Sequence, residues 1–179
     1  MARSTPSTFR LTSTATETAD TEGQGADMSG KLHFDCESRP LTVRIATLLL
    51  AGFAGRDVAA TERHIADMEK VGVPRPARFP AIYPVIPALL SQADRHEVYG
   101  TDTTPEVEFV LFGHEGEVFV TVGNDQCDTA VEAAGMAEKS KNLCQKVVAR
   151  HAWPLSSVKD HWDRLVLGME IDRRQVVDE

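Results

Sequence analysis

The chain has 179 residues, a formal net charge of −8 and an isoelectric point near 5.2. This length suits one domain with a sizeable core. The acidic balance argues against a nucleic-acid or anionic-membrane partner, because phosphate binding needs clustered lysine and arginine. Three widely spaced cysteines without a CxxC pair suit a reducing compartment. We therefore expect a cytoplasmic protein.

Residues 1–30 are dominated by serine, threonine, alanine, glycine and acidic residues. Such a segment cannot bury enough apolar surface to order itself, so we expect a disordered tail. It lacks the apolar core of a secretory signal. Met28 stands just before the first patterned sequence, which leaves the start site open between Met1 and Met28. Residues 31–179 are expected to form a single domain.

Alternating apolar residues predict a strand over 32–36, and a β-rich and then apolar run follows over 41–53. A helix is expected over about 58–71, because Asp57 is a favourable N-cap and an apolar face repeats behind it. Prolines recur from 74 to 87, which predicts a structured loop without regular helix or central strand. That loop either covers the core or forms the wall of a small-molecule pocket.

The second half of the chain predicts shorter elements. Residues 97–100 are typical of a short strand, and residues 126–134 suit one or two helical turns. A loop at 153–155 and another strand over 161–167 complete the pattern. The whole predicts a β-rich α+β fold with few short helices.

The stretch between Glu106 and Asp125 predicts a β-hairpin. Residues 106–112 and 117–122 are rich in β-branched and aromatic side chains, and the cluster Gly-His-Glu-Gly at 113–116 separates them. If those four residues form the loop, the register of the two strands is set. The expected pairs are Phe112 with Glu117, Glu108 with Thr121, and Glu106 with Gly123.

Three carboxylates share one face of this hairpin. Asp125 would lie one diagonal step beyond the partner of Glu106, at a backbone distance of roughly 7–8 Å. One ion could then bind between the carboxylates of Glu106, Glu108 and Asp125, whereas three unpaired acids would repel one another. Oxygen ligands favour Mg²⁺, Mn²⁺ or Ca²⁺ over Zn²⁺. The alternative is a solvated acidic face, and a one-residue change in loop length would reverse the faces.

The order of several motifs supports a resemblance that extends from about Leu32 to about Leu167. Three segments, 51–57, 106–109 and 139–141, resemble the DUF2848 proteins, a bacterial branch of the fumarylacetoacetate hydrolase superfamily. The motif series of that wider superfamily is similar to Glu106-x-Glu108, Asn124-Asp125, and Lys139-Ser140 followed by Cys144.

The resemblance implies a fold, a cofactor and a reaction class. The fold would be a mixed β-sheet rolled around a site that holds Mg²⁺ or Mn²⁺. Members of the superfamily act on 2-oxo acids and 1,3-dicarbonyl compounds by C–C hydrolysis, hydration, isomerisation or decarboxylation. By position, Glu106, Glu108 and Asp125 would bind the metal, and Lys139 would face the substrate oxygens.

The general base is harder to place from the sequence. Hydrolytic members of the superfamily carry a histidine and a glutamate three residues apart early in the chain, and strict register puts Thr61 and His64 there. His64 and Asp67 keep a similar spacing after a three-residue shift, which would place both on one helix face. Glu62 is another candidate. The alternative for all of these positions is an ordinary charged helix surface.

Some positions depart from the superfamily pattern. Thr129 stands where an arginine is common, and Gln145 stands where a proline is common. The chain also ends before the strands expected last, which would leave a sheet edge unpaired and favour a homodimer. We expect a metal-dependent enzyme of small 2-oxo acids, with hydrolase or lyase chemistry. The alternative is a catalytically inactive small-molecule binding or scaffold protein with the same fold.

Overall fold

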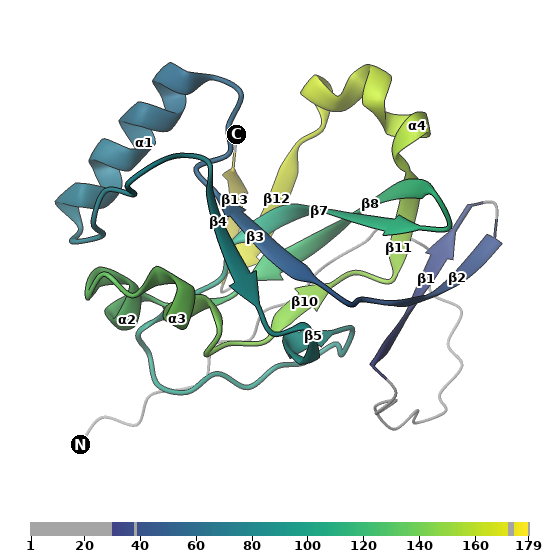
Figure 1. The fold of residues 1–179 in the computed structure, drawn as a ribbon, viewed down its shortest axis with the longest axis horizontal. Helices are drawn as coiled ribbons and strands as arrows, with labels where there is room; N and C mark the ends of the chain where they lie inside the picture. Colours follow the sequence, from purple (N-terminus) through teal and green to yellow (C-terminus); the bar gives the residue numbers. More distant parts are fainter. Residues whose placement is uncertain (1–29, 38, 172–173, 179) are drawn as a thin grey trace.

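The structure is a computed structural model that describes residues 30–37, 39–171 and 174–178 (Figure 1). The expected disordered tail lies outside the described residues, except for Gly30. The predicted α+β fold with a mixed sheet, rich in strands, is confirmed. No helix among the described residues is long and apolar enough to cross a membrane.

Strands outnumber helices in the described part of the chain. The helices are α1 (Val58–Lys70), α2 (Thr129–Ala133), α3 (Ala137–Lys141) and α4 (Leu155–Val158), with 3₁₀ turns at Pro87–Leu89 and Lys159–Arg164. The strands are β1 (Lys31–Cys36), β2 (Arg39–Arg44), β3 (Leu48–Gly52), β4 (Ala81–Val85), β5 (Leu90–Ser91), β6 (Thr103–Thr104), β7 (Val107–His114), β8 (Glu117–Asp125), β9 (Cys127–Asp128), β10 (Lys146–Val148), β11 (His151–Pro154), β12 (Leu167–Ile171) and β13 (Arg174–Asp178).

A seven-stranded mixed sheet forms the centre of the fold. Its order is β2-β1-β11-β8-β10-β5, and β7 pairs with the other edge of β8. The β1–β11 and β10–β5 pairs are parallel, and the pairs made by β8 are antiparallel. Three two-stranded ribbons stand apart from this sheet: β3–β4, β6–β9 and β12–β13. The long strand β8 therefore joins most of the sheet together.

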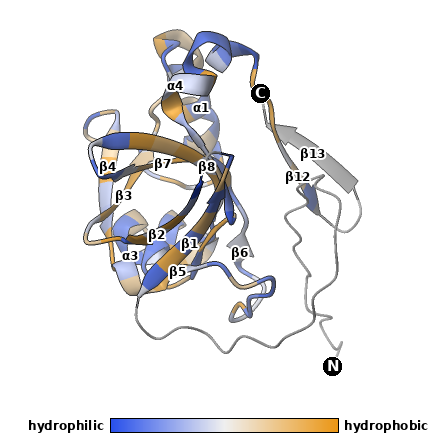
Figure 2. Ribbon diagram, turned by 90° about the vertical axis from the view of Figure 1, so that its right-hand side faces the viewer, coloured by the Kyte–Doolittle hydropathy of each residue, from blue (hydrophilic) through white to orange (hydrophobic). Residues whose placement is uncertain are grey.

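The core lies on one face of this sheet. β1 alternates between exposed and buried residues, as a half-buried strand should. Phe112 stacks between Phe34 and Phe119, with ring centroids 4.3 and 5.3 Å away. Full burial of a phenylalanine side chain stabilises the fold by about 1.5–3 kcal/mol. In Figure 2 the hydrophobic colour runs along strands of the sheet, including β1 and β7.

Helix α1 confirms the predicted cap and length. The Asp57 carboxylate accepts hydrogen bonds from two backbone N–H groups of the first turn, at 2.9 and 3.0 Å. Gly72 ends the helix with a φ of 95°, which few other residues adopt. The buried face is narrower than predicted, because Ile65 is buried while Val58 and Val71 are exposed.

The proline-rich segment contains a strand that the sequence did not predict. Residues Ala81–Val85 form β4 and pair antiparallel with β3, and Pro84 lies opposite Leu49. A proline has no N–H to donate to a neighbouring strand, so it is disfavoured in a central strand, which is paired on both edges. The strand is tolerated because β4 belongs to a two-stranded ribbon, where one of its edges needs no partner.

Three further expectations were wrong and one is confirmed. Residues 97–100 form no strand, and Tyr99 is fully exposed, so nothing supports a strand there. The expected loop at 153–155 is instead the end of β11 and the start of α4. Most of 161–167 is a 3₁₀ turn, whose Trp162 packs against Phe109. The helical turns expected after Gln126 are present as α2.

The β7–β8 hairpin is present, but its register differs by two residues from the prediction. Its turn is Glu115-Gly116 alone, and both residues have positive φ, at 50° and 83°. His114 therefore pairs with Glu117, and Glu108 lies opposite Gly123. The four-residue loop was wrong because Glu115, which is not a glycine, takes up the left-handed conformation. A shift of two residues preserves which side chains share a face.

Candidate functional site

The candidate site lies at the open end of the β7–β8 hairpin. The Asp125 N–H donates to the Glu106 carbonyl at 2.8 Å, which extends the ladder past β7 and sets the two residues opposite each other. The side chain of Asn124 also accepts from the Glu106 N–H at 2.8 Å. The two predicted ligands Glu106 and Asp125 are therefore neighbours on one face, held by backbone contacts.

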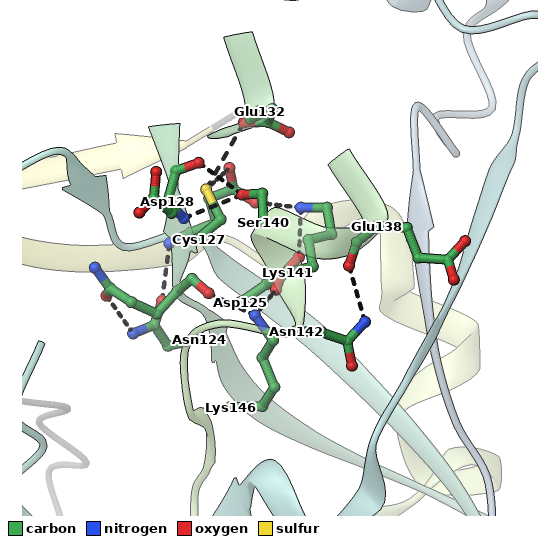
Figure 3. A network of polar contacts seen from close by, with 12 residues as sticks. Asn124, Asp125, Cys127, Asp128, Glu132, Glu138, Ser140, Lys141, Asn142 and Lys146 are labelled. Atoms are coloured by element: carbon green, nitrogen blue, oxygen red, sulfur yellow. Dashed lines mark hydrogen bonds and ion pairs between the residues drawn. The ribbon is translucent and has the colours of Figure 1, made fainter. Parts of the chain in front are cut away.

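A buried lysine, rather than open space, lies between these two carboxylates. Lys141 Nζ is 2.7 Å from Asp125 Oδ2 and 3.2 Å from Glu106 Oε2, and its side chain is 7% exposed. The other Asp125 oxygen, Oδ1, has no regular hydrogen bond but lies 2.6 Å from Lys146 Nζ. We regard that ion pair as its partner, because the charges are opposite and both groups are buried. Figure 3 shows the two lysines beside Asp125.

The position of Lys141 follows from how α3 is anchored. Ser140 is fully buried, donates to the Asp128 carbonyl at 2.7 Å and accepts from the Asp128 N–H at 3.1 Å. This contact directs Ser140 and Lys141 inward. Lys139 lies about 200° away from Lys141 around the helix and is exposed. The lysine at the carboxylates is therefore Lys141, and Lys139 faces solvent.

A second group of donor atoms adjoins Glu106. The Cys127 sulfur lies 3.4 Å from Glu106 Oε1 and 3.7 Å from Glu132 Oε2. The three donor atoms all lie within 4.8 Å of one another, Cys127 is buried, and the two glutamates are half-buried. This Glu–Cys–Glu group could hold a metal ion. Neither Glu108 nor Asp125 belongs to it.

A buried polar network fixes the backbone around the cysteine. Asn124 donates to Gln126 at 3.1 Å, Gln126 donates to the Thr103 hydroxyl at 2.6 Å, and that hydroxyl donates to the Cys127 carbonyl at 2.7 Å. Asp128 caps α2 by accepting a hydrogen bond from the Val131 N–H at 2.9 Å. These contacts hold the Glu–Cys–Glu group on a rigid frame, as a preorganised site requires.

Glu106, Asp125, Lys141, Cys127 and Glu132 form one charged cluster. Burial and charge shift the pKa values of several of its side chains. Burial raises the pKa of Glu106; Lys141 opposes this effect and Asp125 adds to it. Burial alone would lower the pKa of Lys141, but the carboxylates of Glu106 and Asp125 outweigh it and raise that pKa. Burial, and then the charges of Glu106 and Glu132, raise the pKa of the Cys127 thiol. Lys141 is therefore a permanent cation, and Cys127 is a neutral thiol in the absence of a metal.

A pocket of about 310 Å³ opens beside this cluster. Its lining comes from α2, α3, β4 and the loop between α1 and β4, and Figure 1 shows α2 and α3 below α1. Glu132 belongs both to the pocket wall and to the Glu–Cys–Glu group. Tyr83 also lines the pocket, and its ring centre lies 5.9 Å from Lys141 Nζ. A ligand in this pocket would lie close to the charged cluster.

The carboxylate Glu108 is placed apart from the other two predicted ligands. It is exposed and pairs across the hairpin with Gly123, two residues along the strand from the Glu106–Asp125 pair. β7 is an edge strand at this point, so a side chain on it can face solvent. The structure therefore brings Glu106 and Asp125 together with Lys141. Glu108 lies outside this group, exposed on the edge strand β7.

The three predicted base candidates lie on α1. Asp67 is exposed and forms an ion pair with Lys70, and Glu62 forms one with Arg75 at 2.5 Å. The His64 ring lies 5.7 Å from the ring of Phe53, a residue of the pocket wall. In the described part of the chain, none of the three contacts the charged cluster.

Sequence reasoning missed Lys141, Lys146, Cys127 and Glu132. One signal was present for Lys141: Ala137, Ser140 and Lys141 follow the i, i+3, i+4 spacing of an inward helix face. No comparable pattern marks Cys127 and Glu132, since their approach to Glu106 depends on where α2 packs.

No curated protein and no solved structure gives a significant match to the chain. A family model described as "Protein of unknown function (DUF2848)" matches residues 51–177, which is most of the chain. The narrower of the two resemblances is thus confirmed, while membership of the fumarylacetoacetate hydrolase superfamily stays a prediction. The chain belongs to the DUF2848 family.

Proposed function

We propose that this protein is a divalent-metal-dependent enzyme that acts on a small 2-oxo acid or 1,3-dicarbonyl compound. The observation that carries the proposal is the buried Lys141 between two carboxylates, next to a Glu–Cys–Glu group whose Glu132 lines a pocket. Buried charges cost solvation energy and cluster where a protein performs chemistry. The motif series similar to the fumarylacetoacetate hydrolase superfamily supports the same reaction class.

Lys141 would act as the fixed cation of the site. Its ammonium group has three donors, and Glu106 and Asp125 account for two of them. The raised pKa keeps it charged at neutral pH. Its third donor, on the ammonium group that lies 5.9 Å from the ring centre of the pocket residue Tyr83, would bind a substrate oxygen on which negative charge develops, and it would need no reorganisation during the reaction.

Glu106 and Glu132 would hold a divalent ion, Mg²⁺ or Mn²⁺ by the resemblance to the superfamily, which would supply Lewis-acid chemistry toward the keto oxygen of the substrate. At the pocket wall, Arg75 is the single cationic residue among the described lining residues. Its ion pair with Glu62 holds the guanidinium in place. Arg75 would thus orient a substrate carboxylate, which assigns Glu62 a positioning role instead of the role of a base.

Decarboxylation asks less of this site than hydrolysis does. In decarboxylation the electrons of the broken C–C bond pass to the keto oxygen as CO₂ leaves, and one proton must then be returned to carbon. Hydrolysis additionally needs a base to activate water. Glu62, His64 and Asp67 do not contact the charged cluster in the described chain, so we favour decarboxylation.

Calorimetric titration of Mn²⁺ into the wild-type protein and Glu106→Gln tests the metal site. We expect saturable binding to the wild type and at least a tenfold weaker affinity in the variant. Glu106 belongs both to the carboxylate pair around Lys141 and to the Glu–Cys–Glu group. Glu108→Gln is the matched control, since it removes the same charge two residues away. Equal weak binding by all three proteins would refute the proposal.

Turnover is tested with oxaloacetate, a 2-oxo dicarboxylate. We expect the protein with Mn²⁺ to consume it faster than Mn²⁺ alone does, and we expect Lys141→Met to remove the difference. The alternative function is an inactive small-molecule binding protein, which the lack of contact between the described α1 candidates and the cluster favours. In that case oxaloacetate would raise the melting temperature without being consumed. The homodimer and the cytoplasmic location stay predictions.

A further inference from the structure

The contacts of the Cys127 thiol do not fit a simple hydrogen-bonding role. The sulfur lies 3.4 Å from a Glu106 oxygen and 3.7 Å from a Glu132 oxygen. A thiol carries one proton, so it can donate to only one of these carboxylates at a time. The other oxygen then faces the sulfur without a hydrogen between them. A cation among the three atoms would satisfy all of them together.

The two sulfur–oxygen separations suit a tetrahedral metal site. Zinc–sulfur bonds of about 2.3 Å and zinc–oxygen bonds of about 2.0–2.2 Å give a sulfur–oxygen separation of about 3.5 Å in a tetrahedron. The two observed separations, 3.4 and 3.7 Å, lie on either side of that value. Mg²⁺ instead requires near-ideal octahedral coordination by oxygen, which a sulfur ligand does not provide.

The surroundings provide rigid support and access. Cys127 is fully buried, and the Thr103 hydroxyl holds its carbonyl at 2.7 Å. Glu132 reaches the group from α2 and also lines the pocket of about 310 Å³, so an ion can enter from that side. Three protein ligands with a fourth position open to a pocket are the arrangement of catalytic rather than structural zinc sites.

We infer that Cys127 binds a borderline transition metal, of the class of Zn²⁺ and Co²⁺, together with Glu106 and Glu132. The inference rests on the proposed metal site and adds a sulfur ligand and a preference over Mg²⁺. In the binding step a sulfur–metal bond forms and the thiol proton passes to the buffer, so no electron is transferred. A soft ligand is what selects this class of metal over Mg²⁺.

Co²⁺ is the probe, because a thiolate bound to it gives a sulfur-to-cobalt charge-transfer band in the near ultraviolet. The full chain, kept reduced, is titrated with Co²⁺. We expect the band to saturate at one equivalent and to disappear on addition of Zn²⁺, while a hundredfold excess of Mg²⁺ leaves it unchanged. Cys127→Ser should lose the band, and Cys144→Ser should keep it, since Cys144 is a nearby thiol outside the group.

A second variant covers the case in which Cys127→Ser does not fold, which circular dichroism would reveal. Glu132→Gln alters a half-buried position, and we expect it to weaken Co²⁺ binding at least tenfold. A band that persists in Cys127→Ser, or that vanishes in Cys144→Ser, would overturn the assignment. Mn²⁺ binding that depends on Glu106 without a charge-transfer band for Co²⁺ would overturn the sulfur ligand alone. Absence of binding for both ions would overturn the proposed function as well.

Discussion

The two ends of the β7–β8 hairpin bury opposite kinds of side chain on the same face. Near the turn Phe112 lies opposite Phe119, and their rings stack in the core. At the other end, six residues before Phe112 and six after Phe119, Glu106 lies opposite Asp125. Lys141 bridges these two carboxylates. One ladder therefore supports an apolar core at one end and a buried charge cluster at the other.

The difference shows what each end contributes. Packing of the phenylalanine rings stabilises the fold by removing apolar surface from water. The charge cluster gains little net stability, because taking ions out of water costs about as much as their attraction returns. A protein that needed only stability would be as well served by apolar residues at both ends. The charged end is therefore the one that points to function.

Truncation of the aromatic end should have the largest effect. Phe119 is 1% exposed, and Phe119→Ala would leave a cavity beside Phe112. We expect the free energy of unfolding to fall by about 4 kcal/mol. Because no titrating group is involved, the loss should be the same at pH 5 and pH 7. Chemical denaturation at both values measures it, and a loss below about 1 kcal/mol would mean that the ring is not part of the core.

Removal of the cation tests the charged end. Lys141→Met leaves Glu106 and Asp125 facing each other without compensation, and we expect a loss of about 3 kcal/mol at pH 7. The pKa of Glu106 is raised by burial even with Lys141 present, and it would rise further without this lysine. Below the usual carboxyl pKa, 4.5, Glu106 is protonated in both folded and unfolded chains. The deficit should therefore shrink as the pH falls toward that value, unlike the loss in Phe119→Ala.

Lys139→Met is the matched control for that measurement. Lys139 belongs to the same helix but is exposed, so we expect a change within about 0.5 kcal/mol at any pH. A larger effect for Lys139→Met than for Lys141→Met would contradict the placement of α3.

The apolar end of the hairpin was predictable and the details of the charged end were not. Alternation along the strands specified the hairpin and which side chains share a face. The register depends on the turn, where Glu115 adopts a positive φ. Nothing in the local sequence predicts this conformation for a glutamate. The prediction survived that error for Glu106 and Asp125, because the shift was by an even number of residues.

The partners of the carboxylates come from segments whose placement only the folded chain decides. Composition does not separate Lys139 from Lys141, the helical spacing of Ala137, Ser140 and Lys141 favours Lys141, and the buried Ser140 contact with Asp128 settles that Lys141 turns inward. Cys127 and Glu132 approach Glu106 because α2 packs beside the strand end. Contacts of this kind depend on tertiary packing, which local patterns do not encode.

The smallest expected effect belongs to Glu108, the third carboxylate on the shared face. Glu108→Gln should change the free energy of unfolding by no more than about 0.5 kcal/mol, because the side chain is exposed. Its Mn²⁺ affinity, measured by calorimetry, should equal that of the wild type, since Glu108 lies outside the Glu–Cys–Glu group. Glu106 and Glu108 are identical in chemistry and two residues apart, with Glu106 just before β7 and Glu108 within it. A tenfold loss of affinity in Glu108→Gln would show that the metal binds at the rim of the sheet, and Lys141 would then have to leave the carboxylates when the ion enters.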